Sequence, residues 1–431
     1  MIQVENDVRK KEFLNIIKKN FLKEAFMFLI SAKYIFKCDD EFSILKDNAV
    51  IFDESIVDYG DVKTMQKKYP NAKFIDSGEN SLLLPAFINP HTHLEFSANS
   101  YDLSYGDFLL WLNSVMKKRE ALSEKAKEEL ILQNIKLMQE SGTATIGEIS
   151  SFGSDLSACV KSSARIIFFN EILGVNEEAN EAKKEDFLKR FYKSKECENE
   201  LFIPALSLHS PYSLNLSLAK FALDFASKNK LLVSTHFLES KHEKLWLEGK
   251  TSKFKPWLSK LSKEPKPHFS KESFVSLFKG QRTLFTHCVF VDDFSVFDKK
   301  LHSITHCVFS NRLLSKKTFK LKRALTSGIN VHIGTDGLSS NISLCMLDEL
   351  RANLLSHRDL DLRKLAKTLI LMSTNKAAKA IDMNLGQIKK GYGADFALFK
   401  IKECEEKDLA LNFILNAKKA EKLYIKGRQC L

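Results

Sequence analysis

The sequence lacks the closely spaced cysteines of a disulfide-rich or zinc-finger protein. Its 8 cysteines are scattered along 431 residues, and no two of them form a Cys-x-x-Cys pair. A disulfide framework is not expected in a chain of this length, and reduced thiols are typical of the cytoplasm. We therefore expect a cytoplasmic protein that is stabilised by its hydrophobic core rather than by cross-links.

Long apolar runs and flexible linkers are also missing. No apolar run reaches the ~20 residues that a membrane-spanning helix needs. The short apolar run from Phe26 to Ala32 follows a stretch rich in Lys and Glu, without the small-residue cleavage site of a signal peptide. With only 16 Gly and 8 Pro, no segment has the composition of a low-complexity linker. We expect no membrane partner.

Acidic residues are outnumbered: 66 Lys and Arg face 54 Asp and Glu, a formal charge of +12. Such an excess is typical of proteins that bind nucleic acid or anionic surfaces. Here the Lys residues are spread along the chain and no nucleic-acid-binding motif accompanies them. We expect no nucleic-acid partner, although a general positive field would favour an anionic small molecule.

The chain length and pattern indicate two domains. A length of 431 residues suits a barrel of ~250–300 residues with a smaller module. Residues 1–26 predict a basic amphipathic helical extension. The strand-rich segments 27–84 and 385–431 are expected to pair with each other into a small β-sandwich domain. Residues 85–384 alternate apolar strand candidates with Lys/Glu/Leu stretches of helical period.

Eight strand candidates lie in the middle of the chain. They are Leu82–Ile88, Thr143–Ile149, Arg165–Asn170, Phe202–Leu208, Leu231–Thr235, Thr283–Thr286, His302–Thr305 and Asn330–Gly334. Eight strands alternating with helices, such as those predicted over 122–141 and 215–229, are typical of an α/β fold of the (β/α)8 TIM-barrel type. In such barrels the catalytic residues lie at the carboxyl ends of the strands.

Five residues suited to metal binding or acid–base chemistry follow these strands: His91, His93, His236, His287 and Asp336. Residues i and i+2 of an extended segment point to the same side, so the His-x-His pair can reach one ion. Neutral imidazoles and a carboxylate are the ligands that zinc or ferrous iron prefers, with one coordination position left for water. We therefore predict one divalent metal ion, Zn²⁺ or Fe²⁺, at the mouth of the barrel.

A carboxylate lies close to this set in the sequence. Glu239 follows His236 by three residues, so a short helical turn would place both on one face. A carboxylate there could accept a proton from the activated water and pass it on. Glu171, after the third strand, is a second carboxylate; a cavity-lining role and the bridging of two metals are both open for it.

The chain resembles the amidohydrolase superfamily from about residue 27 to its end. The stretches that carry the resemblance are "PAFINPHTHLEF", "LHSPYS", "STHFLES", "FTHC", "FSNRLL" and "GTDGLSSNISLCMLDELR". Within the superfamily, the chain is most similar to the mononuclear deaminases of adenosine, S-adenosylhomocysteine and cytosine. No Lys stands at the end of the third or fourth strand, where binuclear members carry a carboxylated Lys, which favours a single metal.

The resemblance implies a role for each residue. The metal ligands would be His91, His93, His236 and Asp336. Glu239 would transfer protons and His287 would orient the hydrolytic water, which makes Glu239, His287 and Asp336 the catalytic set. The resemblance implies further that His209 faces the substrate. From their positions in the sequence, Trp111, Asn311 and Arg312 are further candidate substrate contacts: Trp111 could instead be a core residue, and Arg312 could either meet a substrate carboxylate or form an ordinary salt bridge.

The resemblance also bears on the substrate. It is strongest to the group that deaminates 6-amino-6-deoxyfutalosine on the futalosine route to menaquinone, so an adenine nucleoside is the expected small-molecule partner. Alternatives are 5′-methylthioadenosine, S-adenosylhomocysteine or another purine or pyrimidine ring, and an inactive scaffold on the same fold. A homodimer is the oligomeric state that we consider.

Overall fold

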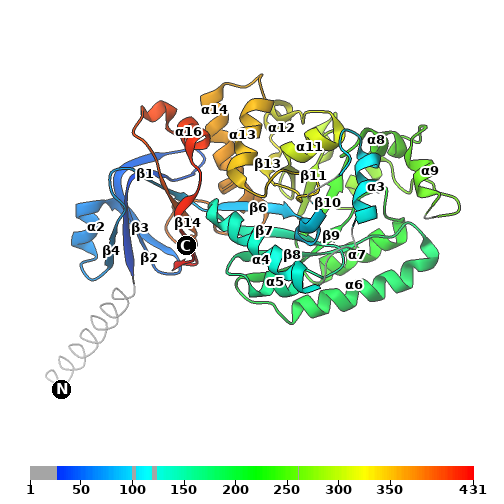
Figure 1. Ribbon diagram of the computed structural model, residues 1–431, viewed down its shortest axis with the longest axis horizontal. Coiled ribbons are helices and arrows are strands. Elements are labelled where there is room, and N and C mark those ends of the chain that lie inside the picture. The colour runs from blue at the N-terminus through cyan, green and yellow to red at the C-terminus, as the bar shows by residue number, and fades with distance from the viewer. Residues whose placement is uncertain (1–26, 100–102, 119–123, 261) are drawn as a thin grey trace, which may run out of the picture.

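The computed structural model describes residues 27–99, 103–118, 124–260 and 262–431. The helical extension predicted for residues 1–26 lies outside the described residues. Two sheets organise the chain. One is built from both chain ends and the other from the middle, and Figure 1 shows them side by side. No helix among the described residues is both long and apolar enough to cross a lipid bilayer.

The middle of the chain forms a parallel eight-stranded barrel. Its strands follow one another in sequence order, and every neighbouring pair is parallel. They are β6 (Phe87–Thr92), β7 (Thr143–Ser150), β8 (Arg165–Ile172), β9 (Phe202–Leu208), β10 (Val233–Phe237), β11 (Thr283–His287), β12 (His302–His306) and β13 (Asn330–Ile333). The predicted (β/α)8 barrel is confirmed. Almost every residue of these strands is buried, as expected for parallel strands that helices cover.

Helices surround the barrel, and their sequences explain where they begin and which face they bury. In α7 (Leu216–Lys228) the Asn215 side chain caps the first turn by accepting a hydrogen bond from the Leu218 N–H. Its buried residues, at helical spacing, are Leu218, Ala219, Ala222, Leu223 and Ala226.

The other helices on the barrel are α4 (Glu124–Glu140), α5 (Leu156–Lys161), α6 (Asn180–Lys195), α8 (Lys241–Leu247), α9 (Phe254–Leu258), α10 (Lys271–Ser276), α11 (Val308–Ser315), α12 (Leu321–Ser327), α13 (Met346–Ser356), α14 (Leu362–Met372) and α15 (Asn375–Ala380). A further helix, α3 (Phe108–Lys118), follows β6. Figure 1 shows α3, α8 and α9 at the side of the barrel farthest from the other sheet. The helices predicted over 122–141 and 215–229 are present as α4 and α7.

The two chain ends pair within one eight-stranded sheet, as the sequence predicted. Its strands are β1 (Phe28–Phe36), β2 (Ile44–Phe52), β3 (Ile56–Asp61), β4 (Lys73–Asp76), β5 (Ser81–Pro85), β14 (Phe396–Lys400), β15 (Ala420–Ile425) and β16 (Arg428–Gln429). The ends meet where β5 pairs antiparallel with β14. The helices α2 (Val62–Lys68) and α16 (Glu406–Asn416) connect strands of this sheet.

This sheet folds over on itself. The ring of Phe52 on β2 lies 4.7 Å from that of Phe396 on β14, although β1 and β5 separate these strands in the sheet. Side chains from both halves thus share one apolar core, as in a sandwich. The exact domain boundaries at residues 84 and 384 remain a prediction.

The first predicted barrel strand, 82–88, needs a correction. The structure divides it: β5 belongs to the sheet of the chain ends and β6 begins the barrel. Pro85 lacks the N–H that would continue a ladder. At the crossing point the Ala86 N–H donates to the Asp395 carbonyl, whereas the Phe87 N–H donates to the Gly142 carbonyl. One apolar segment therefore contributes a strand to each of the two sheets, first β5 and then β6.

Side chains as well as backbone close the seam of the barrel between β6 and β13. The Asn89 amide donates to Thr335 Oγ1 (2.7 Å), and the Thr335 N–H donates back to Asn89 Oδ1 (3.1 Å). The Asp336 N–H also donates to the His91 carbonyl (3.0 Å). This seam therefore sets the position of the residue that follows Thr335, which is Asp336.

We expect Asn89→Ala to lower the free energy of unfolding by about 2–4 kcal/mol, because two buried partners on Thr335 lose their hydrogen bonds. Urea denaturation measures the change. Asn330→Ala is the matched control at the opposite end of β13, where a half-buried amide donates one bond to the Lys376 carbonyl. Equal losses in the two variants would contradict a special role for the Asn89 pair.

Candidate active site at the carboxyl ends of the barrel strands

The five residues singled out in the sequence meet at one end of the barrel. His91 lies in β6, His93 directly follows it, and His236 lies in β10. His287 is the last residue of β11, and Asp336 follows β13 by three residues. All are at least nine-tenths buried. The closed barrel therefore brings together residues that are up to 245 positions apart in the sequence.

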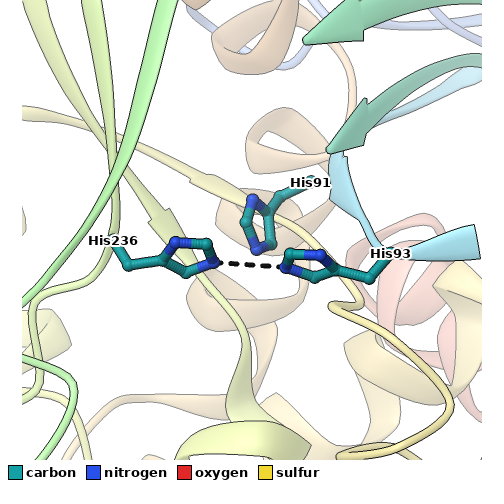
Figure 2. Close-up of side chains that lie close together, drawn as sticks. All are labelled: His91, His93 and His236. Carbon is teal, nitrogen blue, oxygen red and sulfur yellow. Dashed lines mark hydrogen bonds between the residues drawn. The ribbon is translucent and has the colours of Figure 1, made fainter. Parts of the chain in front are cut away.

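Three imidazoles face one another, as Figure 2 shows. His93 Nε2 and His236 Nε2 are 3.2 Å apart, and the His91 ring lies 4.9 Å from both of the other rings. His236 Nδ1 donates to the His209 carbonyl (2.8 Å), which leaves an unshared electron pair on its Nε2. Burial and the neighbouring imidazoles hold the pKa values of His91 and His236 well below their usual range. A cation between these nitrogens would replace their repulsion with attraction.

A carboxylate completes the set. Asp336 Oδ1 lies 3.7 Å from His91 Nε2 and 3.5 Å from His93 Nε2. The Gly337 N–H and the Ser340 hydroxyl donate to this carboxylate and hold its orientation. Three imidazoles and one carboxylate fit zinc or ferrous iron. In addition, His91 Nε2 is buried and has no hydrogen-bond partner among the described residues, as expected of an atom reserved for a metal.

The backbone at the site adopts an unusual conformation. His287 and Asp336 have φ angles of 72° and 62°, and Leu238, which precedes Glu239, has 48°. Residues other than glycine rarely adopt this left-handed region, at a cost of about 1–3 kcal/mol each. Strain of this kind persists where surrounding contacts enforce it, and it is concentrated at functional sites.

Glu239 lies beside His287, with 3.5 Å between Glu239 Oε1 and His287 Nε2. Burial, and then the negative charges of Asp336 and Glu243, raise the pKa of Glu239 well above its usual range. A carboxyl group with a raised pKa holds a proton more tightly than an ordinary carboxyl group, as a group that accepts a proton from water must.

Glu243 is a residue of the site that our sequence analysis missed. Its carboxylate accepts hydrogen bonds from the Leu238 N–H (2.8 Å) and the Glu239 N–H (2.9 Å), and so stabilises the left-handed turn. Ser240 caps α8 by accepting a bond from the Glu243 N–H. The Ser-x-x-Glu pattern of residues 240–243 is a sequence signal that could have identified this residue.

A cavity of about 560 Å³ opens in front of these residues. This volume suits a small-molecule ligand. One wall is a face of α3, with side chains at helical spacing: Phe108, Trp111, Leu112, Val115 and Met116. The Trp111 indole N–H donates to the Ser339 carbonyl (2.7 Å), which ties α3 to the segment after β13. The helix therefore covers the catalytic end of the barrel.

The structure separates the four expected substrate residues into two pairs. Trp111 and His209 line the cavity. Asn311 and Arg312 are not among the lining residues: Asn311 is buried behind His287, and Arg312 is on the exposed face of α11. The geometry therefore gives no support to a substrate contact for Arg312. The lining residue that carries a positive charge is instead Lys183, in the first turn of α6.

Glu171 also lines the cavity, from the end of β8. The Ser151 hydroxyl donates to its carboxylate (2.6 Å), and burial raises its pKa. Its carboxylate lies within 4.8 Å of ligand atoms of His209 and His236. Because Ser151 already binds this carboxylate, the contacts favour a cavity-lining residue over a metal bridge.

Comparisons with known proteins agree with this geometry. The amidohydrolase family matches residues 82–430. An aminodeoxyfutalosine deaminase of Nitratiruptor is 40% identical over 90% of this chain and 96% of that protein. An adenosine deaminase of Helicobacter pylori is 36% identical over 94% of this chain and 99% of that protein.

A solved structure extends the comparison to the fold. The structure of Helicobacter pylori aminofutalosine deaminase in complex with methylthio-coformycin has a TM-score of 0.88 and 36% identity, and covers 94% of this chain and 100% of that one. The resemblance identified in the sequence motifs is thus confirmed over nearly the whole chain. The chain belongs to the amidohydrolase family.

Proposed function

We propose that the protein is a metal-dependent deaminase of an adenine nucleoside, and that 6-amino-6-deoxyfutalosine is its main substrate. The observation that carries this proposal is the convergence of three imidazoles and a carboxylate beside a buried Glu–His pair, at the floor of a small-molecule cavity. We further propose a cytoplasmic enzyme on the futalosine route to menaquinone, with a homodimer as its oligomeric state.

His91, His93, His236 and Asp336 would hold one divalent ion, Zn²⁺ or Fe²⁺. When bound, such an ion acts as a Lewis acid that lowers the pKa of water to about 7. His287 Nδ1 lies 3.0 Å from Asn311 Oδ1, and a proton on Nδ1 would leave Nε2 free to accept a hydrogen bond from the attacking water. This bond would orient the water toward C6 of the adenine ring.

Glu239 would move the protons. It takes one from the attacking water and delivers it to the ring nitrogen N1 as the carbon–oxygen bond forms at C6. The hydroxyl group now on C6 then gives its proton, through Glu239, to the amino group, so that ammonia leaves and the C6 carbonyl of the inosine-type product remains. The raised pKa of Glu239 supports this double role, because one group must both accept and donate.

The substrate assignment rests on relatives and on the cavity. The Nitratiruptor and Helicobacter pylori proteins that are named for aminodeoxyfutalosine or aminofutalosine cover nearly all of this chain. The side chain on the 5′ side of 6-amino-6-deoxyfutalosine ends in a benzoate. The apolar face of α3 suits an aromatic group, and Lys183 offers a cation for its carboxylate.

The second candidate activity is deamination of adenosine or 5′-methylthioadenosine. It is favoured by the similarity to the Helicobacter pylori adenosine deaminase and by the methylthio-coformycin in the solved complex. Deamination of S-adenosylhomocysteine or another ring, and an inactive scaffold, remain alternatives from the sequence. The chemistry at C6 would be the same for each adenine nucleoside.

We expect Asp336→Ala to lose its metal, because it removes the anionic ligand of the set. Elemental analysis of the purified protein measures the metal content. Glu239→Gln is the control, since it alters the same cavity without altering a proposed ligand. Near-stoichiometric metal in Asp336→Ala would remove Asp336 from the ligand set.

We expect Glu239→Gln to keep its metal and fold while kcat falls by about 10²–10⁴, the usual contribution of a general acid–base group. The amide is nearly isosteric with the carboxyl group but cannot take a proton from water. Ultraviolet absorbance at saturating substrate measures kcat. Turnover close to that of the unaltered enzyme would show that another group transfers the proton.

The substrate is tested with a panel of adenine nucleosides and the metal-replete enzyme. We expect the highest kcat/KM for 6-amino-6-deoxyfutalosine and lower values for 5′-methylthioadenosine, S-adenosylhomocysteine and adenosine. A tenfold preference for adenosine or 5′-methylthioadenosine would contradict the main substrate and favour the second candidate. No deamination of any nucleoside would contradict the reaction class.

Within this panel, we expect Lys183→Ala to lower kcat/KM for 6-amino-6-deoxyfutalosine by about 5- to 30-fold, or about 1–2 kcal/mol for a partly exposed charged contact. The value for 5′-methylthioadenosine, which has no carboxylate, should barely change. Lys184→Ala is the matched control, because Lys184 forms an ion pair with Glu181 and does not line the cavity. An unchanged preference in Lys183→Ala would exclude this contact.

A further inference from the structure

A row of buried hydrogen bonds leads away from the active site behind His287. His287 Nδ1 lies 3.0 Å from Asn311 Oδ1, and Asn311 Nδ2 lies 3.1 Å from His306 Nδ1. His306 Nε2 lies 3.1 Å from His357 Nε2. The row links β11 to α11, then to β12, and ends just after α13. The proposed function assigns no role to His306 or His357.

Burial favours the neutral form of the three imidazoles in this row, in which each ring nitrogen is either a donor or an acceptor. His287, Asn311 and His306 are at most 1% exposed, and His357 is 3% exposed. Burial lowers the pKa of His306 well below its usual range and that of His357 to about 4. A neutral imidazole carries one proton, so a hydrogen bond at one nitrogen decides the role of the other.

Two arrangements of protons satisfy such a row, and they differ at the active site. In one, each donor points away from the active site: His287 Nδ1–H to Asn311, Asn311 N–H to His306, and His306 Nε2–H to His357. His287 Nε2 is then bare. In the other, the Asn311 amide is reversed, its NH₂ group donates to His287 Nδ1, and His287 carries its proton on Nε2.

The contacts around His306 favour the first arrangement. The Asn311 amide presents its Oδ1 to His287 Nδ1 and its Nδ2 to His306 Nδ1, and an amide oxygen can only accept a hydrogen bond whereas an NH₂ group can only donate one. A proton on His306 Nε2 leaves Nδ1 as the acceptor, and an acceptor there holds the NH₂ group of Asn311 toward His306.

We propose that His306 is a positioning residue which, through Asn311, keeps the proton of His287 on Nδ1 and leaves Nε2 as the acceptor that faces the reacting water. Asn311 transmits this orientation and does not contact the substrate. The inference rests on the proposed function, since it assigns His287 the task of orienting that water. The inference goes beyond the proposed function, because it assigns a role to His306, which does not line the cavity.

His306→Phe tests the proposal in the zinc-loaded enzyme, because a phenyl ring fills similar space but offers Asn311 no acceptor. We expect kcat to fall by about 10- to 100-fold, a usual range for a residue that orients a functional side chain from behind it. KM and the zinc content should change little. His306→Gln should recover much of kcat, because its side-chain carbonyl can accept from Asn311.

The matched control is His302→Gln. His302 is a buried histidine at the opposite end of β12, and its Nε2 bonds the Phe278 carbonyl. It matches His306 in strand and burial but does not belong to the row. We expect it to alter thermal stability without altering kcat. Equal losses of kcat in His302→Gln and His306→Phe would assign the effect to packing and overturn the proposal.

A spectroscopic measurement separates this proposal from the proposed function. Long-range ¹H–¹⁵N correlation spectra of zinc-loaded, ¹⁵N-histidine-labelled protein report which ring nitrogen carries the proton, and a His287→Gln sample assigns the signal. We expect the Nδ1–H form in the unaltered protein and loss of that form in His306→Phe. A proton on Nε2 in the unaltered protein, or no change in His306→Phe, would overturn the inference, whatever nucleoside the enzyme deaminates.

Discussion

The rest of the structure depends on the crowding of unshared electron pairs at the carboxyl ends of four strands. His93 Nε2 lies 3.2 Å from His236 Nε2, and Asp336 Oδ1 lies 3.5 Å and 3.7 Å from the Nε2 atoms of His93 and His91, in a largely buried region at the floor of the cavity. Without a cation, such an arrangement is repulsive and costs solvation free energy. The contacts around these nitrogens and this carboxylate must therefore hold them together.

Buried carboxylates that lie behind the proposed metal ligands hold much of this arrangement in place. Glu243 holds the turn that carries Glu239, and Glu148 accepts bonds from Thr92 and from the Leu94 N–H on either side of His93. Glu349 accepts from the Asn341 side chain, which also bonds the Thr335 carbonyl. The oxygens of each of these buried carboxylates accept hydrogen bonds that hold the backbone of the site in position, and they are not proposed to bind the metal or the substrate. Left-handed residues can persist beside the ligands for this reason.

The sequence predicts the barrel and the convergence of the proposed metal ligands, because strand ends and the His-x-His spacing are local patterns. The features it misses depend on details that a local pattern does not contain. Asn311 and Arg312 are neighbours on α11 and so differ by about 100° around the helix. Asn311 is buried behind His287, whereas Arg312 is exposed. A prediction that assigns both residues to the substrate does not distinguish these two positions. Likewise, nothing in composition separates Lys183 from the adjacent Lys184.

The pairing of β5 with β14 has a consequence for how the protein is made. During synthesis, residues 28–85 emerge from the ribosome first, whereas their antiparallel partner begins only at Phe396. Until then β5 is an open sheet edge, and open edges invite pairing with other chains. The barrel that separates the two halves is completed in this interval. Assembly of the smaller domain is therefore a late event, which follows synthesis of the barrel and takes place on the side of the barrel away from α3.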